Sequence, residues 1–391
     1  MDKPLRILAV VNVPWDLRLG AARVWIELTE EWCKAGHHVE KFCLTDAFPE
    51  PAASPAQAAL RLLGFPQRAA RFIRENAERF DVIDALIGTL PFPKKSLGFR
   101  GLLVGRSVGL YHLYEKFERA AAKRWPVADK GRLFGRPFYW FFHQRALSAS
   151  RTALSHCDLL NLPNGDELNC VRDEIDAAKP AIVQPYGLRP ERRKILAETA
   201  APAEVRWEKK KIVFIGMWSP RKGSRDWPRI VREVRARVPS ARFLFLGTMI
   251  ADARVWNDLE MEPADFIQIV PQFDPDQLPQ LLSDCTVAAF PSYVEGFGMA
   301  VVEQLAAGLP TVAYDAPGPR DILRGDLGQG LVPPGDAHRF SEVIGDFLTA
   351  DFAAYEQISA RSIETAQRFS WPEIARATAA EYRTHLEHVR V

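Results

Sequence analysis

Two glutamates with a short, glycine-containing spacing stand in the stretch FPSYVEGFGMAVVEQLAAGLP, residues 290–310. If the whole stretch were one helix, eight residues at 100° each would place Glu303 about 80° from Glu295, on a neighbouring face. Glycine is a poor helix former, so the two glycines between them predict a loop at 295–298 and a helix at about 299–307. Glu303 then lies inside the helix, and Glu295 lies over its N-terminus.

This arrangement suits a nucleotide sugar. A helix N-terminus carries unpaired N–H groups and a partial positive charge, and it therefore attracts phosphate. Glycines there let the backbone approach a ligand, and a carboxylate accepts two hydrogen bonds from a ribose diol. We expect the diphosphate at the helix start, the ribose on Glu303 and the transferred sugar near Glu295. The alternative is that both glutamates are solvated side chains.

A second loop with basic residues follows an apolar run, in the sequence FIGMWSPRKG at 214–223. A loop after a strand of a parallel sheet lies at the carboxyl edge of that sheet, where ligands bind. Arg221 as a bidentate donor and Lys222 as a point charge are able to neutralise a diphosphate there. A basic turn that faces water is the alternative, but two phosphate-suited loops on one edge favour the site.

The elements that must position these residues alternate along the chain of 391 residues. Apolar runs predict strands in a first series at 5–13, 39–44, 81–84, 102–104, 158–160 and 181–183, and in a second series at 211–215, 242–246, 266–270, 286–290 and 311–314. Helices are predicted at 21–34, 228–237, 277–283, 298–307 and 371–391, and a small-residue linker at 197–203. This pattern predicts an α/β protein of two doubly wound, Rossmann-like domains that face a central cleft.

Residues 211–335 resemble the C-terminal donor domain of glycosyltransferase family 4, which adopts the GT-B fold. The resemblance is carried by the E-x7-E motif from Glu295 to Glu303, by Lys222-Gly223 and by LVPPGD at 331–336. The FSW sequence at 369–371 and the closing helix resemble the segment that crosses back onto the N-terminal domain. The resemblance implies an acceptor-binding domain at 1–190, a donor-binding domain at 191–368 and a crossing helix at 369–391.

The resemblance also implies roles for individual residues. Lys222 would bind the donor diphosphate, Glu303 the ribose, and Glu295 the donor sugar as the catalytic residue. The implied donor site consists of Gly216, Arg221, Lys222, Val270, Phe273, Gly296, Phe297, Gly298, Met299 and Glu303. Such enzymes are hexosyltransferase-like, usually retain anomeric configuration, and need no cofactor or bound metal because cationic side chains and a helix dipole stabilise the leaving diphosphate.

The sequence departs from the family pattern at two places. Met217 stands where the family often has an arginine after the glycine of the first donor loop. In the N-terminal domain, Val108 stands where many members have a histidine near the donor sugar. We therefore assign Gly20, Arg106 and His112 to the acceptor side, with His112 as the nearby histidine.

The predicted function is transfer of a sugar from a nucleotide-sugar donor to an acceptor hydroxyl. A glycan, a lipid-linked sugar or a small molecule is compatible with the sequence as acceptor. Three alternatives stay open, namely a GT-B sugar-nucleotide epimerase, a phosphorylase and a catalytically inactive nucleotide-sugar-binding homologue.

Residues 115–151 contain nine Lys and Arg against three acidic residues, interleaved with aromatic residues. This composition suits peripheral contact with an anionic membrane, at the inner face, whereas the favoured alternative is an aromatic core with a solvated charged face. Nucleic-acid binding is not expected, because the net charge is only +2 and no recognised module is present.

Composition bears on the cellular location. The five cysteines are scattered without a CxxC pair, which argues against a disulfide framework or a zinc site and indicates a reducing cytoplasm. The apolar run near the N-terminus is broken early by polar residues and proline, so we expect a first strand there rather than a signal peptide.

Overall fold

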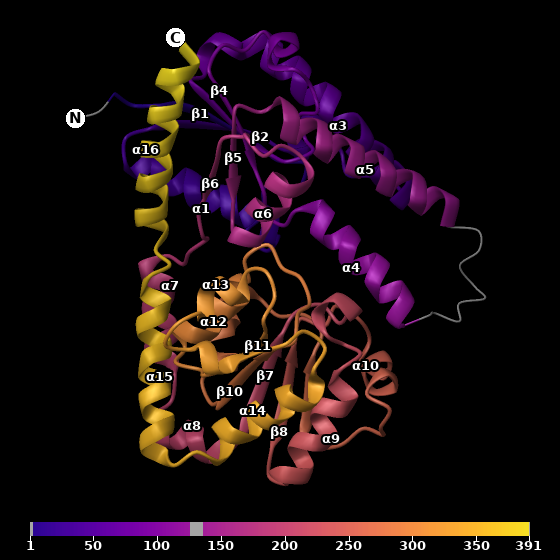
Figure 1. The fold of residues 1–391 in the computed structure, drawn as a ribbon, viewed down its shortest axis with the longest axis vertical. Helices are drawn as coiled ribbons and strands as arrows, with labels where there is room; N and C mark the ends of the chain where they lie inside the picture. Colours follow the sequence, from indigo (N-terminus) through magenta and orange to yellow (C-terminus); the bar gives the residue numbers. More distant parts are fainter. Residues whose placement is uncertain (1–2, 126–135, 391) are drawn as a thin grey trace. The chain divides into compact units, whose positions relative to one another are not determined.

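The computed structural model describes residues 3–125 and 136–390. The chain divides into two compact units, which are called unit 1 (Met1–Tyr186 and Trp371–Val391) and unit 2 (Gly187–Ser370). Within the described residues, each unit holds a six-stranded sheet in which all paired strands are parallel (Figure 1). The predicted α/β architecture of two doubly wound, Rossmann-like sheets is therefore confirmed.

Unit 1 has the strand order β2-β1-β3-β4-β5-β6. Its strands are β1 (Arg6–Val10), β2 (His38–Phe42), β3 (Val82–Leu86), β4 (Leu102–Arg106), β5 (Leu159–Leu162) and β6 (Ala181–Val183). Its helices are α1 (Gly20–Lys34), α2 (Leu44–Ala47), α3 (Pro55–Asn76), α4 (Tyr111–Arg124), α5 (Arg136–His156), α6 (Gly165–Glu174) and α16 (Trp371–Arg390), with 3-10 turns η1 (Ala77–Arg79) and η2 (Lys94–Leu97). The strand order changes direction between β1 and β3, which is the topological switch point of the sheet. The loops after these two strands are therefore a favoured position for a ligand.

Unit 2 has the strand order β12-β11-β10-β7-β8-β9. Its strands are β7 (Lys211–Ile215), β8 (Arg242–Leu246), β9 (Ile267–Val270), β10 (Val287–Phe290), β11 (Thr311–Tyr314) and β12 (Leu331–Val332). Its helices are α7 (Pro190–Thr199), α8 (Ala203–Lys209), α9 (Trp227–Arg237), α10 (Asp252–Asp258), α11 (Leu278–Leu282), α12 (Met299–Ala306), α13 (Pro319–Leu323), α14 (Ala337–Thr349) and α15 (Phe352–Gln367), with 3-10 turns η3 (Pro220–Lys222), η4 (Pro275–Gln277) and η5 (Gly328–Gly330). Here the order reverses between β7 and β10.

Aromatic side chains fill the unit 2 core between the sheet and the helices α9 and α14. Trp227 of α9 packs edge-on against Phe214 of β7 and Phe245 of β8, with ring centroids 5.5 and 4.8 Å apart. Helices α7, α8, α12 and α15 contact one another on the other side of the sheet (Figure 1). The sheet is thereby covered on both faces, which is why its strands read as continuous apolar runs in the sequence.

Helix α16 completes unit 1 although it follows unit 2 in the chain. It packs against α1 and β4. The indole Nε1 of Trp32 on α1 donates to the carbonyl of Ala375 at 3.0 Å. The hydroxyl of Tyr382 donates to the carboxylate of Asp84 at 2.6 Å, and Arg106 Nη2 donates to the same hydroxyl at 2.8 Å. All of these side chains are buried, so α16 is an integral part of the unit 1 core.

The predicted linker at 197–203 is wrong. Helix α7 runs through Thr199 and α8 begins at Ala203, so only residues 200–202 connect them. The small residues that suggested a linker are mostly alanines, and alanine has the highest helix propensity. The long helix α3 and the short edge strand β12 were not predicted.

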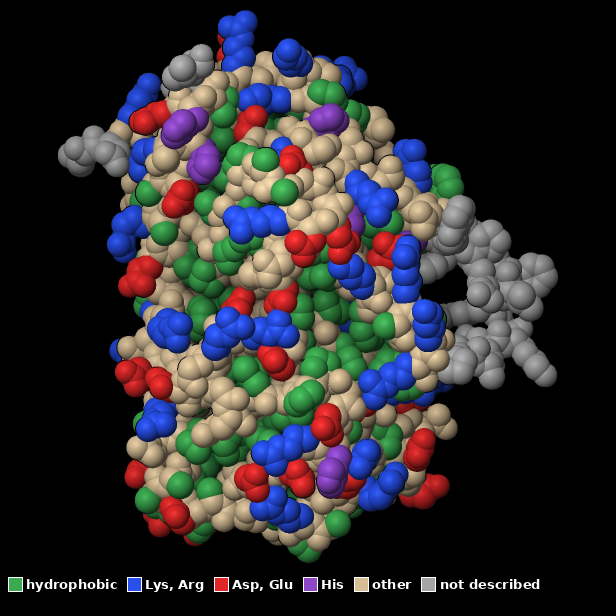
Figure 2. Space-filling view, viewed as in Figure 1, with side chains coloured by type: hydrophobic (Ala, Val, Ile, Leu, Met, Phe, Trp, Pro, Cys, Tyr) green, Lys and Arg blue, Asp and Glu red, His purple; other side chains and the backbone are tan. Residues whose placement is uncertain are grey.

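The basic, aromatic stretch at 115–151 falls on α4 and α5, and its residues 126–135 lie outside the described residues. Side chains of both charge signs are interspersed over the face seen in Figure 2. Among the described residues, no helix combines the length and the apolarity that a membrane span requires.

Candidate functional site

The loops after β7 and β10 are joined by ion pairs. These two strands are neighbours at the topological switch point of the unit 2 sheet, where the strand order changes direction. Lys222 Nζ lies 2.6 Å from Glu295 Oε1, and Arg221 Nη1 lies 3.3 Å from the same oxygen. Arg221 Nη1 also donates to the carbonyl of Val294 at 3.2 Å, and the Tyr293 N–H donates to the carbonyl of Arg221 at 2.9 Å. The structure thus joins the two loops that the sequence assigned to one ligand.

Two glycines give these loops their shape. Gly223, at φ +82°, lies so close to the β10 loop that a Cβ atom would stand 2.3 Å from the carbonyl oxygen of Pro291. Gly298, at φ +95°, is the residue from which α12 begins. Any other residue would be strained at either position, because the left-handed region is costly for side chains with a Cβ. Gly223, next to Lys222, and Gly298, three residues after Glu295, are therefore required by the local backbone.

Burial sets the electrostatics of Lys222. Burial lowers the pKa of its ammonium group, and the neighbouring Glu295 carboxylate acts in the opposite direction. Its Nζ also lies 4.9 Å from the centroid of the Phe290 ring, a cation–π contact. With 14% of its side chain exposed, Lys222 interacts more strongly than a fully solvated lysine with an anion that replaces or joins Glu295, because the local dielectric is lower than that of water.

Glu303 lies inside α12, is buried, and faces a residue that the sequence did not suggest. Arg192 Nη2 of α7 lies 3.7 Å from Glu303 Oε1, and it also donates to the carbonyl of Pro275 at 2.6 Å. No spacing or motif links α7 with α12, so only the tertiary structure reveals Arg192 as the neighbour of this carboxylate.

The remaining residues that the sequence assigned to the donor lie at the same carboxyl edge but follow different strands. Gly216 follows β7, and the side chain of Lys222 runs beside it, with its Cδ 3.6 Å from where a Cβ of Gly216 would be. Met217 is half exposed. Val270 ends β9 and Phe273 follows it, two strands away from β7, where the Val270 carbonyl accepts from the Gly247 N–H at 2.8 Å. Gly296, Phe297 and Met299 lie in the loop and first turn that lead into α12.

The acceptor-side prediction for Arg106 is wrong. Its side chain is fully buried in unit 1 and bonds through Nη2 with the Asp84 carboxylate at 2.8 Å and with Tyr382. A charged side chain is tolerated in a core only when it is paired in this way, so Arg106 holds β3, β4 and α16 together and is not available to a ligand.

Gly20 and His112 have different surroundings. Gly20 is the exposed first residue of α1. His112 is buried in the first turn of α4, where its Nε2 accepts from Arg151 Nε at 3.2 Å. Burial and the Arg151 charge both lower the pKa of the His112 imidazole, which favours its neutral form at pH 7.

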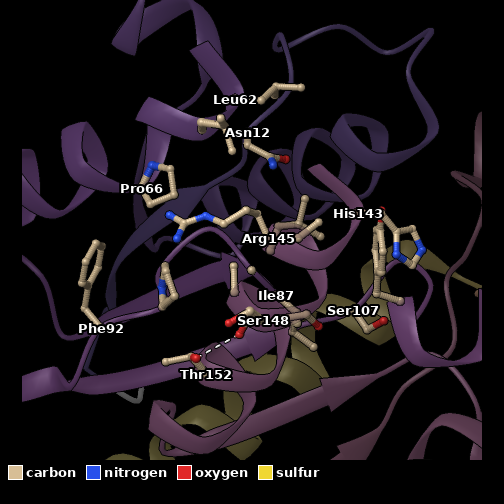
Figure 3. A pocket seen from close by; sticks show the side chains of 18 of the residues that line it. Asn12, Leu62, Pro66, Ile87, Phe92, Ser107, His143, Arg145, Ser148 and Thr152 are labelled. Carbon is tan, nitrogen blue, oxygen red and sulfur yellow. Dashed lines mark hydrogen bonds between the residues drawn. The ribbon is translucent and has the colours of Figure 1, made fainter. Parts of the chain in front are cut away.

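Unit 1 contains a cavity of about 670 Å³ on the carboxyl side of its sheet (Figure 3). Asn12 follows β1, Ile87 and Gly88 follow β3, and Ser107 and Val108 follow β4. The cavity therefore lies at the reversal of strand order in unit 1, and Val108, the residue at the family's histidine position, lines it. Sequence patterns indicated this edge of the sheet but not the parts of α3 and α5 that close the cavity.

Comparison with known proteins agrees with these features. Residues 198–367 match the family model for glycosyl transferases group 1. A D-inositol 3-phosphate glycosyltransferase from Mycobacteroides abscessus is 28% identical in an alignment of 196 residues that covers 47% of this chain and 42% of that protein. The match thus covers less than half of that curated relative.

Solved structures resemble the chain over nearly its whole length. Sucrose-phosphate synthase from Thermosynechococcus elongatus has a TM-score of 0.72 at 19% identity and covers 97% of this chain and 98% of its own. Anabaena HepE in complex with UDP and glucose has a TM-score of 0.63 at 16% identity, with 97% and 100% covered. The chain therefore has the two-domain GT-B fold, and the similarity to group 1 glycosyl transferases lies in residues 198–367.

Proposed function

We propose that the protein transfers a sugar from a nucleotide-sugar donor, bound by unit 2, to an acceptor hydroxyl. The observation that carries the proposal is the ion-pair cluster of Lys222, Arg221 and Glu295. It lies at the topological switch point of the unit 2 sheet, beside the N-terminus of α12. The complex of Anabaena HepE contains UDP and glucose, which supports a nucleotide-linked donor of this kind.

Each residue has a distinct task in this proposal. Lys222 and Arg221 neutralise the donor diphosphate and stabilise the charge that develops on it as the glycosidic bond breaks. Glu303, held by Arg192, accepts hydrogen bonds from the ribose hydroxyls. When the diphosphate replaces Glu295 as the partner of Lys222 and Arg221, the Glu295 carboxylate contacts the transferred sugar. This chemistry needs no metal, and by resemblance to family 4 it retains the anomeric configuration.

A panel of UDP-, GDP- and ADP-sugars tests the donor site by thermal shift, since a ligand of the folded state raises its stability. We expect one donor to raise Tm, and Lys222→Ala and Glu303→Ala to weaken its binding about tenfold to a hundredfold. Lys209→Ala, an exposed lysine at the opposite end of β7, is the matched control and should bind normally.

The same nucleotide sugars, incubated with the protein and analysed for products, separate the alternatives. Release of nucleoside diphosphate in the absence of acceptor indicates a transferase, whereas conversion of the donor sugar without release indicates an epimerase. Consumption of glycan and phosphate alone indicates a phosphorylase, and binding without turnover indicates an inactive homologue. Unchanged donor affinity in both Lys222→Ala and Glu303→Ala would refute the site.

Peripheral membrane contact through 115–151 is a separate proposal that rests on composition. Of its basic residues, Lys116 and Arg119 are already engaged with Glu174 and Glu115. Co-sedimentation with anionic vesicles at low salt would support the contact, and a protein that stays in the supernatant would exclude it.

A further inference from the structure

The cavity of unit 1 has the position and size of a small-molecule site. Loops that follow β1, β3 and β4 form one side of it, and in open α/β sheets ligands bind outside these carboxyl ends. Its volume of about 670 Å³ falls within the range of roughly 300–1,000 Å³ that drug-sized ligands occupy.

Apolar side chains make up much of its wall. They come from α3 and from the loops after β3 and β4, and include Leu62, Leu63, Pro66, Pro91, Phe92 and Val108. Leu62 remains 45% exposed, and its neighbour Leu60 remains 62% exposed. Removing apolar surface from water is favourable by about 25 cal/mol per Å², so an apolar group that fills the cavity gains free energy along this wall.

One cation enters this apolar space. Arg145 of α5 lines the cavity, and Figure 3 shows its side chain extending into it. Within the part of the chain that the structure describes, Arg145 has no hydrogen-bond or ion-pair partner, and neither aspartate nor glutamate lines the cavity. An unpaired guanidinium beside apolar walls favours an anionic group, which it binds in bidentate fashion.

We propose that this cavity binds the acceptor, and that the acceptor is an amphipathic anion, an apolar body that carries a phosphate or carboxylate. The apolar body lies against α3, and the anionic group pairs with Arg145. A neutral glycan would leave the solvent-exposed guanidinium without an anionic partner and the leucines in contact with water. The assignment as acceptor rests on the proposed glycosyl transfer, whereas the ligand chemistry rests on the cavity alone.

Calorimetric titration without donor tests the ligand chemistry. The probes are decyl phosphate, decanoate, decyl maltoside and inorganic phosphate, each detergent below its micelle concentration. We expect decyl phosphate or decanoate to bind at least about tenfold more tightly than decyl maltoside and inorganic phosphate, because only they use both halves of the site. The order of the two anions then tells a phosphate from a carboxylate ligand.

Two variants connect binding to the cavity. Arg145→Gln should weaken decyl phosphate about tenfold, and Ala149→Phe should reduce its binding by filling the space. Arg100→Gln removes an exposed arginine at the amino end of β4 and should change nothing. Equal binding of decyl maltoside, or an Arg145→Gln protein that binds decyl phosphate as well as the parent, would overturn the inference.

Donor binding separates this inference from the proposed function. If a nucleotide sugar still raises Tm while no amphipathic anion binds, the acceptor inference fails and the donor site stands. If decyl phosphate binds through Arg145 while no nucleotide sugar does, the ligand class holds and the proposed function fails.

Discussion

At the scale of single residues, the proposed donor site contains two carboxylates that already form ion pairs with cationic side chains. Glu295 contacts Lys222 and Arg221, and Glu303 contacts Arg192, so each acidic side chain that would touch the donor is oriented before the donor arrives. Side chains that are already held lose less conformational entropy when they bind a ligand. The ion pairs therefore act as preorganisation, and a residue behind the site influences binding without touching the donor.

Arg192→Ala tests this role for a positioning residue. Without the guanidinium, Glu303 loses the ion pair in which Arg192 Nη2 lies 3.7 Å from its Oε1, and its orientation is less restricted. We expect the donor KM to rise about tenfold with a smaller change in kcat, because ribose binding is weakened before and during the reaction alike. Steady-state kinetics over a donor series measures both constants.

The adjacent arginine supplies the control for this experiment. Arg193 Nη1 donates to the carbonyl of Gln367 at 2.6 Å. Arg193→Ala should leave the donor KM unchanged. If both variants behave alike, or if Arg192→Ala lowers kcat with KM intact, Arg192 does not position the ribose-binding carboxylate.

At the scale of elements, strands were easier to predict than the contacts between helices. The predicted strands at 211–215, 242–246 and 311–314 agree with β7, β8 and β11 residue for residue. Strands buried on both faces leave an unbroken apolar run, which is a local signal. The loop at 295–298 and the helix that follows were also predicted, because the low helix propensity of glycine is a local property that the sequence shows directly.

The missed features depend on distant parts of the chain. Arg106 is a cationic residue at the end of a predicted strand, as a ligand-binding residue would be. Its partner Tyr382 comes from α16, and no local sequence pattern shows that pairing. Arg192 and Arg145 were missed for the same reason, since each acquires its role from another helix or loop. Sequence reasoning therefore finds the edge of the sheet where a site lies and misses the side chains that reach it from elsewhere.

The start of α6 contains a buried carboxyl group with a consequence for stability. Glu167 Oε1 accepts the Leu110 N–H at 2.9 Å, which ties α6 to the residue before α4. Burial raises the pKa of the Glu167 carboxyl from 4.5 to about 8, while its hydrogen bonds with Ser107 and Leu110 act in the opposite direction. Unit 1 therefore keeps this carboxyl protonated over a range in which the unfolded chain ionises it.

We expect the free energy of unfolding to fall as pH rises between about 5 and about 8, because the folded state binds more protons than the unfolded state there. Glu167→Gln keeps the accepting oxygen and cannot ionise, so its Tm should fall less over this range. Tm measured at half-unit pH steps gives the comparison, with the exposed Glu118→Gln as control. Parallel pH profiles for the parent and Glu167→Gln would show that Glu167 does not titrate in this window.

At the scale of the whole molecule, the two units differ in how the chain builds them. Unit 2 is continuous and contains its own aromatic core together with Lys222, Glu295, Glu303 and Arg192. Unit 1 is discontinuous, because α16 returns to it after unit 2 is complete. We infer a division of labour in which unit 2 holds the donor and unit 1 the acceptor.

Separate fragments test both statements. Residues 187–370 alone should unfold cooperatively and gain Tm from the donor nucleotide, since every residue of the donor cluster is present. Residues 1–186 alone should not fold cooperatively, because Trp32, Asp84 and Arg106 lose buried hydrogen-bond partners on α16, and a buried polar group without its partner is destabilising. Joining 371–391 to them through a flexible Gly/Ser linker should restore a cooperative transition in urea.

A well-folded 1–186 fragment would show that α16 is dispensable. A folded 187–370 fragment that binds none of the nucleotides would show that the donor site needs residues outside unit 2.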